Sequence, residues 1–435
     1  MGASRRLGTL HAERSTRQLT LAARRGVQFS DIDFMEKSLD HKLRAIHADP
    51  HGSKEFILAD AKDADMAFGV AAPGRSPERH AGETRFKSLA EYRQQIRDVI
   101  RQQVVDIVLM SASISETLCL EERLFNNSPI TPAVRANDAT DVHIPRGGTT
   151  HLQPARPFRT ATLDHAQCGH LDCEPGERGR GVDLGLYSVT FNNRCELDLL
   201  TLEKYKQFRE EAERHNFRHF LEVFDPNAPQ GLSTEQVPAF INDVVARTLA
   251  GVTAKGRPLF LKMVYHGPQA LEELVTYDPH LIVGVLGGAA GTTLDAFQLI
   301  HDVRKYGGRA ALFGRKINQA ECQLAFIEFL RLVVDGEITP VEAVRAYHAV
   351  LAKLGLEPHR TLEQDLELRT TATSYGAANR TISIPAAATS LNGRASGCAK
   401  QAAPRNPPAV DFANMTPQER LQYHQSRLNR LFGER

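Results

Sequence analysis

The chain has 435 residues, of which 42% are hydrophobic, so it can bury the core of one large domain or of two ordinary ones. Its 53 Lys and Arg residues offset 52 Asp and Glu residues, which argues against nucleic acid bound through bulk charge and against an acidic disordered chain. No apolar run reaches the length of a membrane span, and six irregularly spaced cysteines without a secretory signal predict reduced thiols in a cytoplasmic protein.

Residues 1–50 are expected to form an N-terminal arm and a leading helix. Six arginines fall within residues 1–30, where Glu13 is the only acidic residue. A transit peptide has a similar composition, but we favour a solvated arm.

Residues 51–357 alternate short apolar runs with segments of helical periodicity, which predicts βα units around a parallel sheet. The eight candidate strands are 56–60, 105–113, 130–136, 183–191, 218–224, 259–265, 281–288 and 309–315. Helix starts with a capping box or its Asp analogue are expected at Ser88 with Glu91, Thr292 with Asp295 and Thr339 with Glu342. Eight such units in this length predict a TIM (β/α)8 barrel, with a doubly wound open sheet as the alternative.

Residues 358–435 change in character. They are rich in Ala, Pro, Asn, Thr and Arg, which predicts a flexible low-complexity tail. Thr416, Pro417 and Glu419 are expected to start a short helix at its end, with an apolar stripe of Leu421, Leu428, Leu431 and Phe432.

A lysine inside the sixth predicted strand points to chemistry. Barrel enzymes place their active sites at the C-terminal ends of the strands, where Lys262 lies in LFLKMVYHG, residues 259–267. Strand alternation predicts that Lys262 faces the barrel interior with Phe260 and Val264. Burial would favour the neutral amine, the form that attacks a carbonyl to make a Schiff base. A lysine that reaches the barrel mouth or pairs with a carboxylate is the alternative.

The next two strands end in patterns suited to phosphate. Gly287 and Gly288 end strand seven just before a helix, whose first N–H groups and dipole favour an anion. Gly314 and Arg315 end strand eight and offer backbone and a guanidinium to the same anion. Barrel enzymes commonly bind phosphate with these two loops.

These residues resemble a known family. Lys262 with Tyr265-His266-Gly267, Gly287-Gly288, and Gly314-Arg315-Lys316-Ile317-Asn318-Gln319 are similar to motifs of the class I aldolases in the deoxyribose-phosphate aldolase and archaeal-type fructose-bisphosphate aldolase superfamily. The resemblance is strongest over residues 262–319. It implies a Schiff-base Lys262, a phosphate held by Gly288 and Arg315, and homo-oligomers. It implies no cofactor.

The same resemblance assigns proton-transfer groups and one departure. It implies a polar role for Asp60 at the end of strand one. On strand five, the fructose-bisphosphate branch has a tryptophan and, two residues later, an acid tyrosine, where this chain has Glu222 and Phe224. Phenylalanine cannot transfer a proton, so either Glu222, kept protonated by burial, or Tyr265, Tyr187 or a water takes that role, or the substrate differs.

A second constellation, DHAQCGHLDC, falls between strands three and four. His165, Cys168, His170 and Cys173 are of the types that bind structural zinc. Their spacing fits no zinc-finger pattern, and Schiff-base chemistry needs no metal. We therefore expect no metal, with zinc as the alternative.

The sequence thus predicts a class I aldolase-like lyase of carbohydrate metabolism that cleaves or forms a C–C bond in a phosphorylated ketose or small keto-phosphate. The alternatives are a superfamily acyl or keto transferase and a non-catalytic barrel that binds a phosphorylated ligand. The expected partners are that substrate and further copies of the chain, without nucleic acid or membrane. The expected site residues are Lys262, Asp60, Glu222 and Tyr265 for catalysis and Gly287, Gly288, Gly314 and Arg315 for phosphate.

Overall fold

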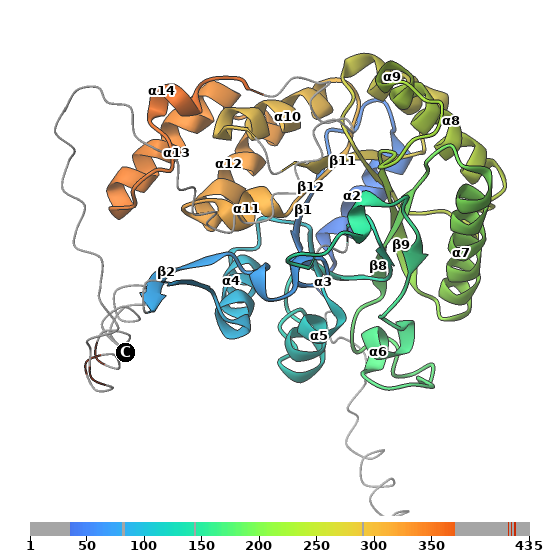
Figure 1. The fold of residues 1–435 in the computed structure, drawn as a ribbon, viewed down its shortest axis with the longest axis horizontal. Helices are drawn as coiled ribbons and strands as arrows, with labels where there is room; N and C mark the ends of the chain where they lie inside the picture. Colours follow the sequence, from blue (N-terminus) through green and yellow to red (C-terminus); the bar gives the residue numbers. More distant parts are fainter. Residues whose placement is uncertain are drawn as a thin grey trace, which may run out of the picture. The chain divides into compact units, whose positions relative to one another are not determined.

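The computed structural model describes residues 35–80, 83–142, 145–288, 291–369, 416, 419 and 422. One compact unit begins at Lys37, and a closed barrel of eight parallel strands forms its centre (Figure 1). The strands follow one another around the barrel in the order β1 (Ile57–Lys62), β12 (Ala310–Phe313), β11 (Val283–Gly287), β10 (Leu261–Met263), β9 (Arg218–Phe224), β8 (Leu184–Thr190), β5 (Thr131–Arg135) and β4 (Ile107–Met110). β4 pairs back to β1, so the predicted TIM barrel is confirmed, and each predicted strand segment overlaps one strand of it.

The helices surround the barrel as the βα pattern predicts. They are α2 (Ser38–Ala48), α3 (Ala64–Phe68), α4 (Leu89–Gln102), α5 (Ala112–Ser115), α6 (Leu163–Cys168), α7 (Cys195–Arg214), α8 (Val237–Ala250), α9 (Pro268–Tyr277), α10 (Thr293–Lys305), α11 (Arg315–Gln319), α12 (Gln323–Asp335), α13 (Pro340–Leu354) and α14 (Leu362–Asp365). Short turns of helix lie at η1 (Gly69–Ala71), η2 (Glu116–Glu121), η3 (Thr150–Leu152), η4 (Thr234–Gln236) and η5 (Ala254–Gly256). The three predicted helix starts at Ser88, Thr292 and Thr339 each form the expected capping box. Two small sheets, β2 (Arg75–His80) with β3 (Glu83–Phe86) and β6 (Asp138–Ala139) with β7 (Pro157–Phe158), lie outside the barrel.

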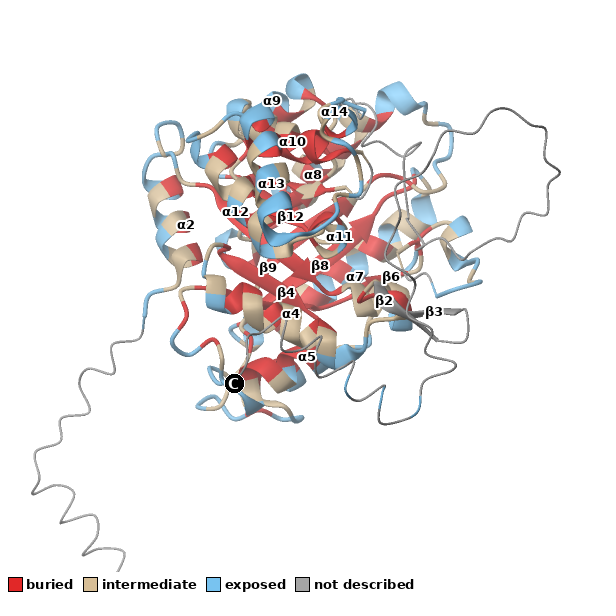
Figure 2. Cartoon of the chain, turned by 90° about the vertical axis from the view of Figure 1, so that its left-hand side faces the viewer, coloured by how far each residue is buried: buried red, intermediate tan, exposed pale blue. Residues whose placement is uncertain are grey.

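Alternate strand residues fill two separate apolar layers. Ala59 and Leu109 belong to the interior cluster of the barrel, whereas Leu58 and Val108 pack in the layer between strands and helices. Phe220 and Phe260 stack inside the barrel with ring centroids 4.6 Å apart. Figure 2 shows the result, with buried strands enclosed by helices whose outer faces are exposed. This alternation decides which polar side chains can reach an interior site.

Both ends of the described barrel unit extend beyond the predicted barrel segment. Leu39, Leu43 and Ile46 of α2 join the interior cluster of the barrel, so this leading helix is part of its core. At the other end, α14 packs against α13. Residues 1–34 lie outside the described residues, as does most of the predicted tail helix. Thr416 and Glu419 do make the reciprocal hydrogen bonds of its expected capping box.

No helix within the described ranges is both long and apolar enough to span a bilayer.

One pair of cysteines departs from the sequence prediction. Cys168 and Cys173 form a disulfide, with Cα atoms 6.1 Å apart. Gly169 ends α6 in the left-handed conformation, with φ of 89°, and turns the chain back so that the two thiols meet. The prediction that all cysteines are reduced is therefore wrong for this pair. Among the described residues, the free thiols belong to Cys119, Cys195 and Cys322.

Candidate active site

Lys262 lies inside the barrel beside a carboxylate. On β10 it alternates with Leu261 and Met263, which pack in the helix layer, so its side chain faces the interior above Phe260. The amine Nζ lies 2.5 Å from Oε1 of Glu222, and the two residues are partners in the β9–β10 register. Both are buried, with 6% and 2% of their surfaces exposed. The lysine is thus held in place by a buried counterion at the C-terminal ends of the strands.

Glu222 is in turn fixed by two neighbouring strands. Its Oε2 accepts hydrogen bonds from Ser188 Oγ at 2.7 Å and from Arg135 Nη2 at 3.3 Å. Arg135 Nη1 also donates to Ser188 Oγ at 2.9 Å. Asn137 holds the Ser188 backbone at both its N–H and its carbonyl. The carboxylate therefore has a single orientation, with Oε1 toward Lys262.

Asp63 completes the charged cluster. Its Oδ2 accepts a hydrogen bond from Arg135 Nε at 2.5 Å. Burial alone would raise the pKa of Asp63, but Arg135 and then Lys262 outweigh it and lower that pKa, so Asp63 stays ionised. Burial likewise disfavours the Arg135 cation, yet Asp63 and Glu222 raise the pKa of Arg135. Lys262, Arg135, Asp63 and Glu222 thus bring two positive and two negative charges together.

Asp60 does not join this cluster. It lies on the same side of β1 as Leu58, facing the helix layer, while Ala59 and Ala61 face the interior. Its carboxylate pairs with Lys62 Nζ at 3.1 Å, and both side chains are fully buried. Burial raises the pKa of Asp60 and lowers that of Lys62, with each opposing the other's shift. Strand one therefore supplies Asp63 to Lys262, in place of the expected Asp60.

Lys62 is fully used in the helix layer. Besides Asp60, it donates hydrogen bonds to Asn318 Oδ1 at 2.5 Å and to Gln323 Oε1 at 2.9 Å. Asn318 belongs to the family-like stretch after strand eight, and its amide also contacts the hydroxyl of Tyr92. These contacts give Lys62 and Asn318 a structural role between β1 and the helices.

The two tyrosines considered for proton transfer also face away from Lys262. Tyr265 is 5% exposed and lies with Leu271 and Leu274 in the layer between the strands and helices. Tyr187 stacks on Phe208 in that layer, with ring centroids 4.5 Å apart. Among the acid groups weighed from the sequence, the structure brings Glu222 to the lysine.

The glycines after strands seven and eight have different tasks. A Cβ on Gly287 would lie 2.1 Å from the Phe313 ring, so this glycine accommodates the packing of β11 on β12. A Cβ on Gly314 would lie 2.8 Å from the carbonyl oxygen of Ala61. Gly287 and Gly314 are thus explained by barrel packing. Gly288 directly follows the end of β11, and its contact with phosphate stays a prediction.

Arg315 begins α11 directly after strand eight. Burial lowers the pKa of its guanidinium, and the negative charge of Glu222 opposes that shift. The arginine is therefore close enough to Glu222 to feel its charge. Arg315 is thus on the side of the barrel where Glu222 and Lys262 lie, and its role as phosphate anchor stays a prediction.

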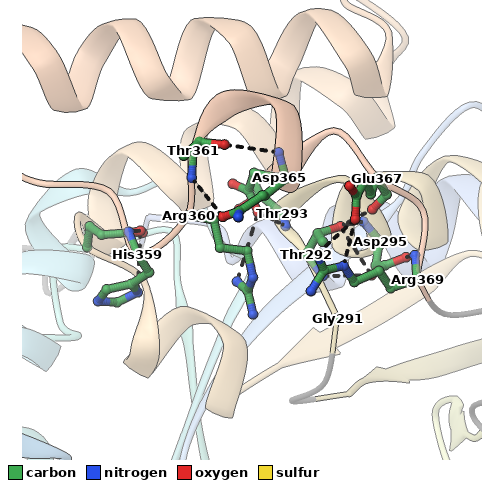
Figure 3. Close-up of polar contacts among 12 residues, drawn as sticks. Gly291, Thr292, Thr293, Asp295, His359, Arg360, Thr361, Asp365, Glu367 and Arg369 are labelled. Carbon is green, nitrogen blue, oxygen red and sulfur yellow. Dashed lines mark hydrogen bonds and ion pairs between the residues drawn. The ribbon is translucent and has the colours of Figure 1, made fainter. Parts of the chain in front are cut away.

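The helix start after Gly288 is occupied by the chain itself (Figure 3). The backbone N–H of Thr293 donates to Asp365 Oδ1 at 2.7 Å, and that of Thr292 donates to Asp295 Oδ2 at 2.6 Å. The Thr292 hydroxyl donates to the Glu367 carbonyl at 2.8 Å. These N–H groups of α10 are thus hydrogen-bonded to carboxylates of the protein. The start of α10 is therefore not available to bind phosphate through these N–H groups and the helix dipole, as the sequence had predicted.

Lys316 joins the two loops. Its Nζ donates to the Gly291 carbonyl at 2.8 Å, and burial lowers its pKa to about 8. The amine thus ties the loop after β12 to the start of α10.

Asp63, Arg135 and Ser188 were not among the site residues predicted from the sequence. Arg135 ends an apolar run, ITPAVRA, in the same way that Lys262 interrupts its own. A cation in a buried strand is the signal that identifies both residues.

The four residues of the alternative zinc site do not gather as a set. His165 Nδ1 bonds the Thr162 hydroxyl at the start of α6, at 2.5 Å. Cys168 and Cys173 form the disulfide, and His170 contacts Glu177.

No protein-family model and no curated protein matches the sequence. The chain is similar to the solved structure of an archaeal fructose 1,6-bisphosphate aldolase, with 14% identity, a TM-score of 0.48 and coverage of 68% of this chain and 99% of that one. A fructose-bisphosphate aldolase from Slackia heliotrinireducens DSM 20476 gives 13% identity, a TM-score of 0.49 and coverage of 75% and 95%. The orotidine 5'-phosphate decarboxylase from Pyrococcus horikoshii OT3 gives 10% identity, a TM-score of 0.34 and coverage of 64% of this chain and 99% of that one. Similarities this remote do not identify a reaction, which has to be inferred from the side chains.

Proposed function

We propose that this protein is a Schiff-base lyase that uses Lys262 to form or cleave a C–C bond in a phosphorylated keto compound. The observation that carries the proposal is the buried contact of 2.5 Å between Lys262 Nζ and Glu222 Oε1 inside the barrel mouth. A nucleophilic lysine needs a group that removes its proton and returns protons to the leaving oxygen. Glu222 is placed for both tasks.

The reaction follows from these two groups. Glu222 takes a proton from the Lys262 ammonium, and the free electron pair of the nitrogen attacks the substrate carbonyl to give a carbinolamine. Glu222 returns the proton to the carbinolamine hydroxyl, which leaves as water, and an iminium remains. The iminium accepts the electron pair of the breaking C–C bond, or of a C–H bond whose proton passes to Glu222.

Three neighbours hold Glu222 in position. Ser188 and Arg135 both donate hydrogen bonds to its Oε2, and Asp63 is a second carboxylate paired with the Arg135 guanidinium. Arg135 has a carboxylate on each side, which leaves it suited to orienting Glu222. We assign Arg135, Ser188 and Asp63 as positioning residues.

Gly288 and Arg315 are the proposed phosphate contacts. A glycine lets backbone approach the anion, and a guanidinium can bind it through two parallel hydrogen bonds. The motif resemblance assigns the same pair of residues. The substrate class is therefore a small keto compound with a phosphate near its carbonyl.

A keto or acyl transferase is the second candidate, and Phe224 is the observation that favours it. Phe224 is on the same alternation of β9 as Glu222, at the mouth, where the resembling lyases have an acid tyrosine. Without that hydroxyl, the leaving aldehyde oxygen lacks one proton donor. A non-catalytic barrel would need neither the tyrosine nor a reactive lysine.

Borohydride trapping tests the proposal. The protein is incubated with dihydroxyacetone phosphate as a keto-phosphate probe, reduced, digested and mapped by mass spectrometry. We expect a reduced adduct on Lys262 in the wild type and none in Lys262→Arg, which keeps the charge beside Glu222. If no keto-phosphate probe marks Lys262, the lyase and the transferase are both excluded. An adduct without cleavage of fructose 1,6-bisphosphate would favour the transferase.

A further inference from the structure

The loop after α6 gathers metal-ligand atoms outside the proposed active site. Sγ of Cys168, a ring nitrogen of His170 and a carboxylate oxygen of Glu177 lie within 4.8 Å of one another. Cys173 contributes a second sulfur, which is bonded to Cys168 in this structure. Two sulfurs, one imidazole and one carboxylate form a donor set typical of tetrahedral zinc.

His170 is prepared to act as a ligand through Nε2. Its Nδ1 lies 2.8 Å from the carbonyl oxygen of Leu171. A carbonyl only accepts hydrogen bonds, so Nδ1 carries a proton, and Nε2 is the ring nitrogen left to bind a metal ion once it has lost its own proton. Zinc-binding histidines are commonly fixed in this way by a backbone carbonyl. Nε2 points toward Glu177, at 3.3 Å from Oε2.

Glu177 is oriented by a similar outer contact. Its Oε1 accepts a hydrogen bond from Arg180 Nη1 at 2.9 Å, which leaves Oε2 directed at His170. The loop itself is anchored at its base, because the N–H of Asp172 donates to Asp164 and the N–H of Gly181 donates to the Gln167 carbonyl. The ligand atoms are therefore held by a second layer of hydrogen bonds.

The disulfide and the metal would exclude each other. Zinc binds thiolates, and two thiolates on one tetrahedral zinc lie about 3.8 Å apart, since each Zn–S bond is about 2.3 Å. The Cα atoms of Cys168 and Cys173 are 6.1 Å apart, so a small rotation of the side chains is enough to open the pair. His170 is exposed, which gives both a metal ion and a reductant access to the site.

We propose that Cys168, His170, Cys173 and Glu177 form a redox-dependent zinc site, which is a disulfide when oxidised and binds one zinc ion when reduced. A dithiol reductant supplies two electrons and two protons, the S–S bond breaks, and the reductant leaves as its own disulfide. Zinc binding then releases the two thiol protons. The loop leads into the N-terminal end of β8, which carries Ser188, so either cross-link fastens the segment that precedes this strand.

Metal content in the two redox states tests this proposal. The full chain is treated with a dithiol or with an oxidant, desalted without oxygen, and incubated with zinc, after which bound zinc is measured by atomic emission. We expect about one zinc per reduced chain and none per oxidised chain. Reduced Cys168→Ser and Cys173→Ser should lose the zinc, and Glu177→Gln should bind it roughly tenfold or more weakly. Cys195→Ser, which removes an exposed thiol elsewhere, should keep it.

Cobalt gives an independent readout. In the reduced wild type, Co²⁺ should show sulfur-to-metal charge transfer and the visible bands of a tetrahedral site, and both should vanish in Cys168→Ser. If reduction releases two thiols but the reduced chain binds no more zinc than the oxidised one, the pair is a structural disulfide only and the proposal is overturned. A loss of zinc in Cys195→Ser as large as that in Cys168→Ser would overturn the proposal as well, because zinc would then bind thiols without preference for this site.

Discussion

Replacing Glu222 by glutamine tests its proposed role as the proton carrier of the site. The amide has the shape of the carboxylate and can still accept the hydrogen bond from Ser188, but it carries no charge and accepts no proton. Lys262 keeps its amine, so the adduct with dihydroxyacetone phosphate should still be trapped by borohydride after long incubation, but it should form more slowly because Glu222 no longer takes the Lys262 proton. The proton transfers should slow by roughly 10²–10⁴-fold, the usual contribution of a positioned general acid or base.

The same change has a cost in stability that can be worked from the contact. At 2.5 Å the Lys262–Glu222 attraction is about 7 kcal/mol at an effective dielectric constant of 20. Most of that offsets the desolvation of the two groups, and removing one partner of a buried pair costs about 3–5 kcal/mol in measured cases. Arg135 keeps Asp63 as its counterion, which favours the lower end. Urea unfolding of Glu222→Gln should therefore show a loss of about 3 kcal/mol.

Deuterium exchange measures the proton transfer without knowledge of the second substrate. If Glu222 removes a proton from the carbon next to the iminium, the wild type should incorporate deuterium from D₂O into dihydroxyacetone phosphate, as followed by NMR. Asp60→Asn is the matched control, because Asp60 is an equally buried carboxylate on the other side of the barrel wall. It should lose stability yet exchange at the wild-type rate in the folded protein. Wild-type exchange in Glu222→Gln would refute the assigned role.

Three further changes test the surroundings of the site. Arg315→Ala should raise the concentration of dihydroxyacetone phosphate needed for half-maximal trapping roughly 10–100-fold, the loss of one charge-assisted contact of about 1.5–3 kcal/mol, whereas the exposed Arg345→Ala should leave it unchanged. Asp365→Asn should lower the unfolding free energy at pH 7 by about 1.5–3 kcal/mol, since the Thr293 N–H loses a charged acceptor. Burial would raise the pKa of Asp365, but its hydrogen bonds outweigh burial and lower that pKa below 3.8. The stability difference between the wild type and Asp365→Asn should therefore persist above pH 4 and disappear on further acidification. A stability difference independent of pH would contradict this prediction. Burial lowers the pKa of Lys316 from 10.5 to about 8, so between those pH values the unfolded chain binds more protons than the folded one. The unfolding free energy of the wild type should therefore rise by about 3 kcal/mol relative to that of Lys316→Met as the pH is raised through this range. Parallel pH curves from urea unfolding would show that the amine is not buried as a cation.

The barrel could be predicted from the sequence because each of its strands is a short apolar run followed by a helical pattern. The same runs explain why the strand-one acid was misassigned. FILADAKDAD begins with four consecutive apolar residues, as strands buried on both faces do, so no alternation reveals which side of the strand faces the interior. Asp63 lies beyond the end of β1, at the start of α3, so strand alternation does not predict its direction either.

Hydrogen-bond partners that lie far apart in the chain could not be predicted from the sequence either. Asp365 lies 72 residues after Thr293, and nothing in the local pattern of either residue indicates that one carboxylate fills the start of the other's helix. Gly287 was assigned to phosphate because two adjacent glycines suit a ligand loop. Its actual constraint is the Phe313 ring on the neighbouring strand, which only the register of β11 with β12 brings beside it.

Phe224 narrows the chemistry that Glu222 can perform. The carbon next to an iminium is two bonds from Lys262 Nζ, so a carboxylate oxygen that lies 2.5 Å from that nitrogen can reach its protons. The oxygen of a departing aldehyde lies farther along the substrate, toward the mouth, where β9 presents Phe224. A barrel with this pair should therefore form the enamine readily and protonate the aldehyde oxygen poorly, unless the substrate or a water supplies that proton. On this reasoning Phe224→Tyr should speed cleavage of fructose 1,6-bisphosphate while leaving deuterium exchange unchanged. If both rates stay the same, the leaving oxygen does not lie beside residue 224.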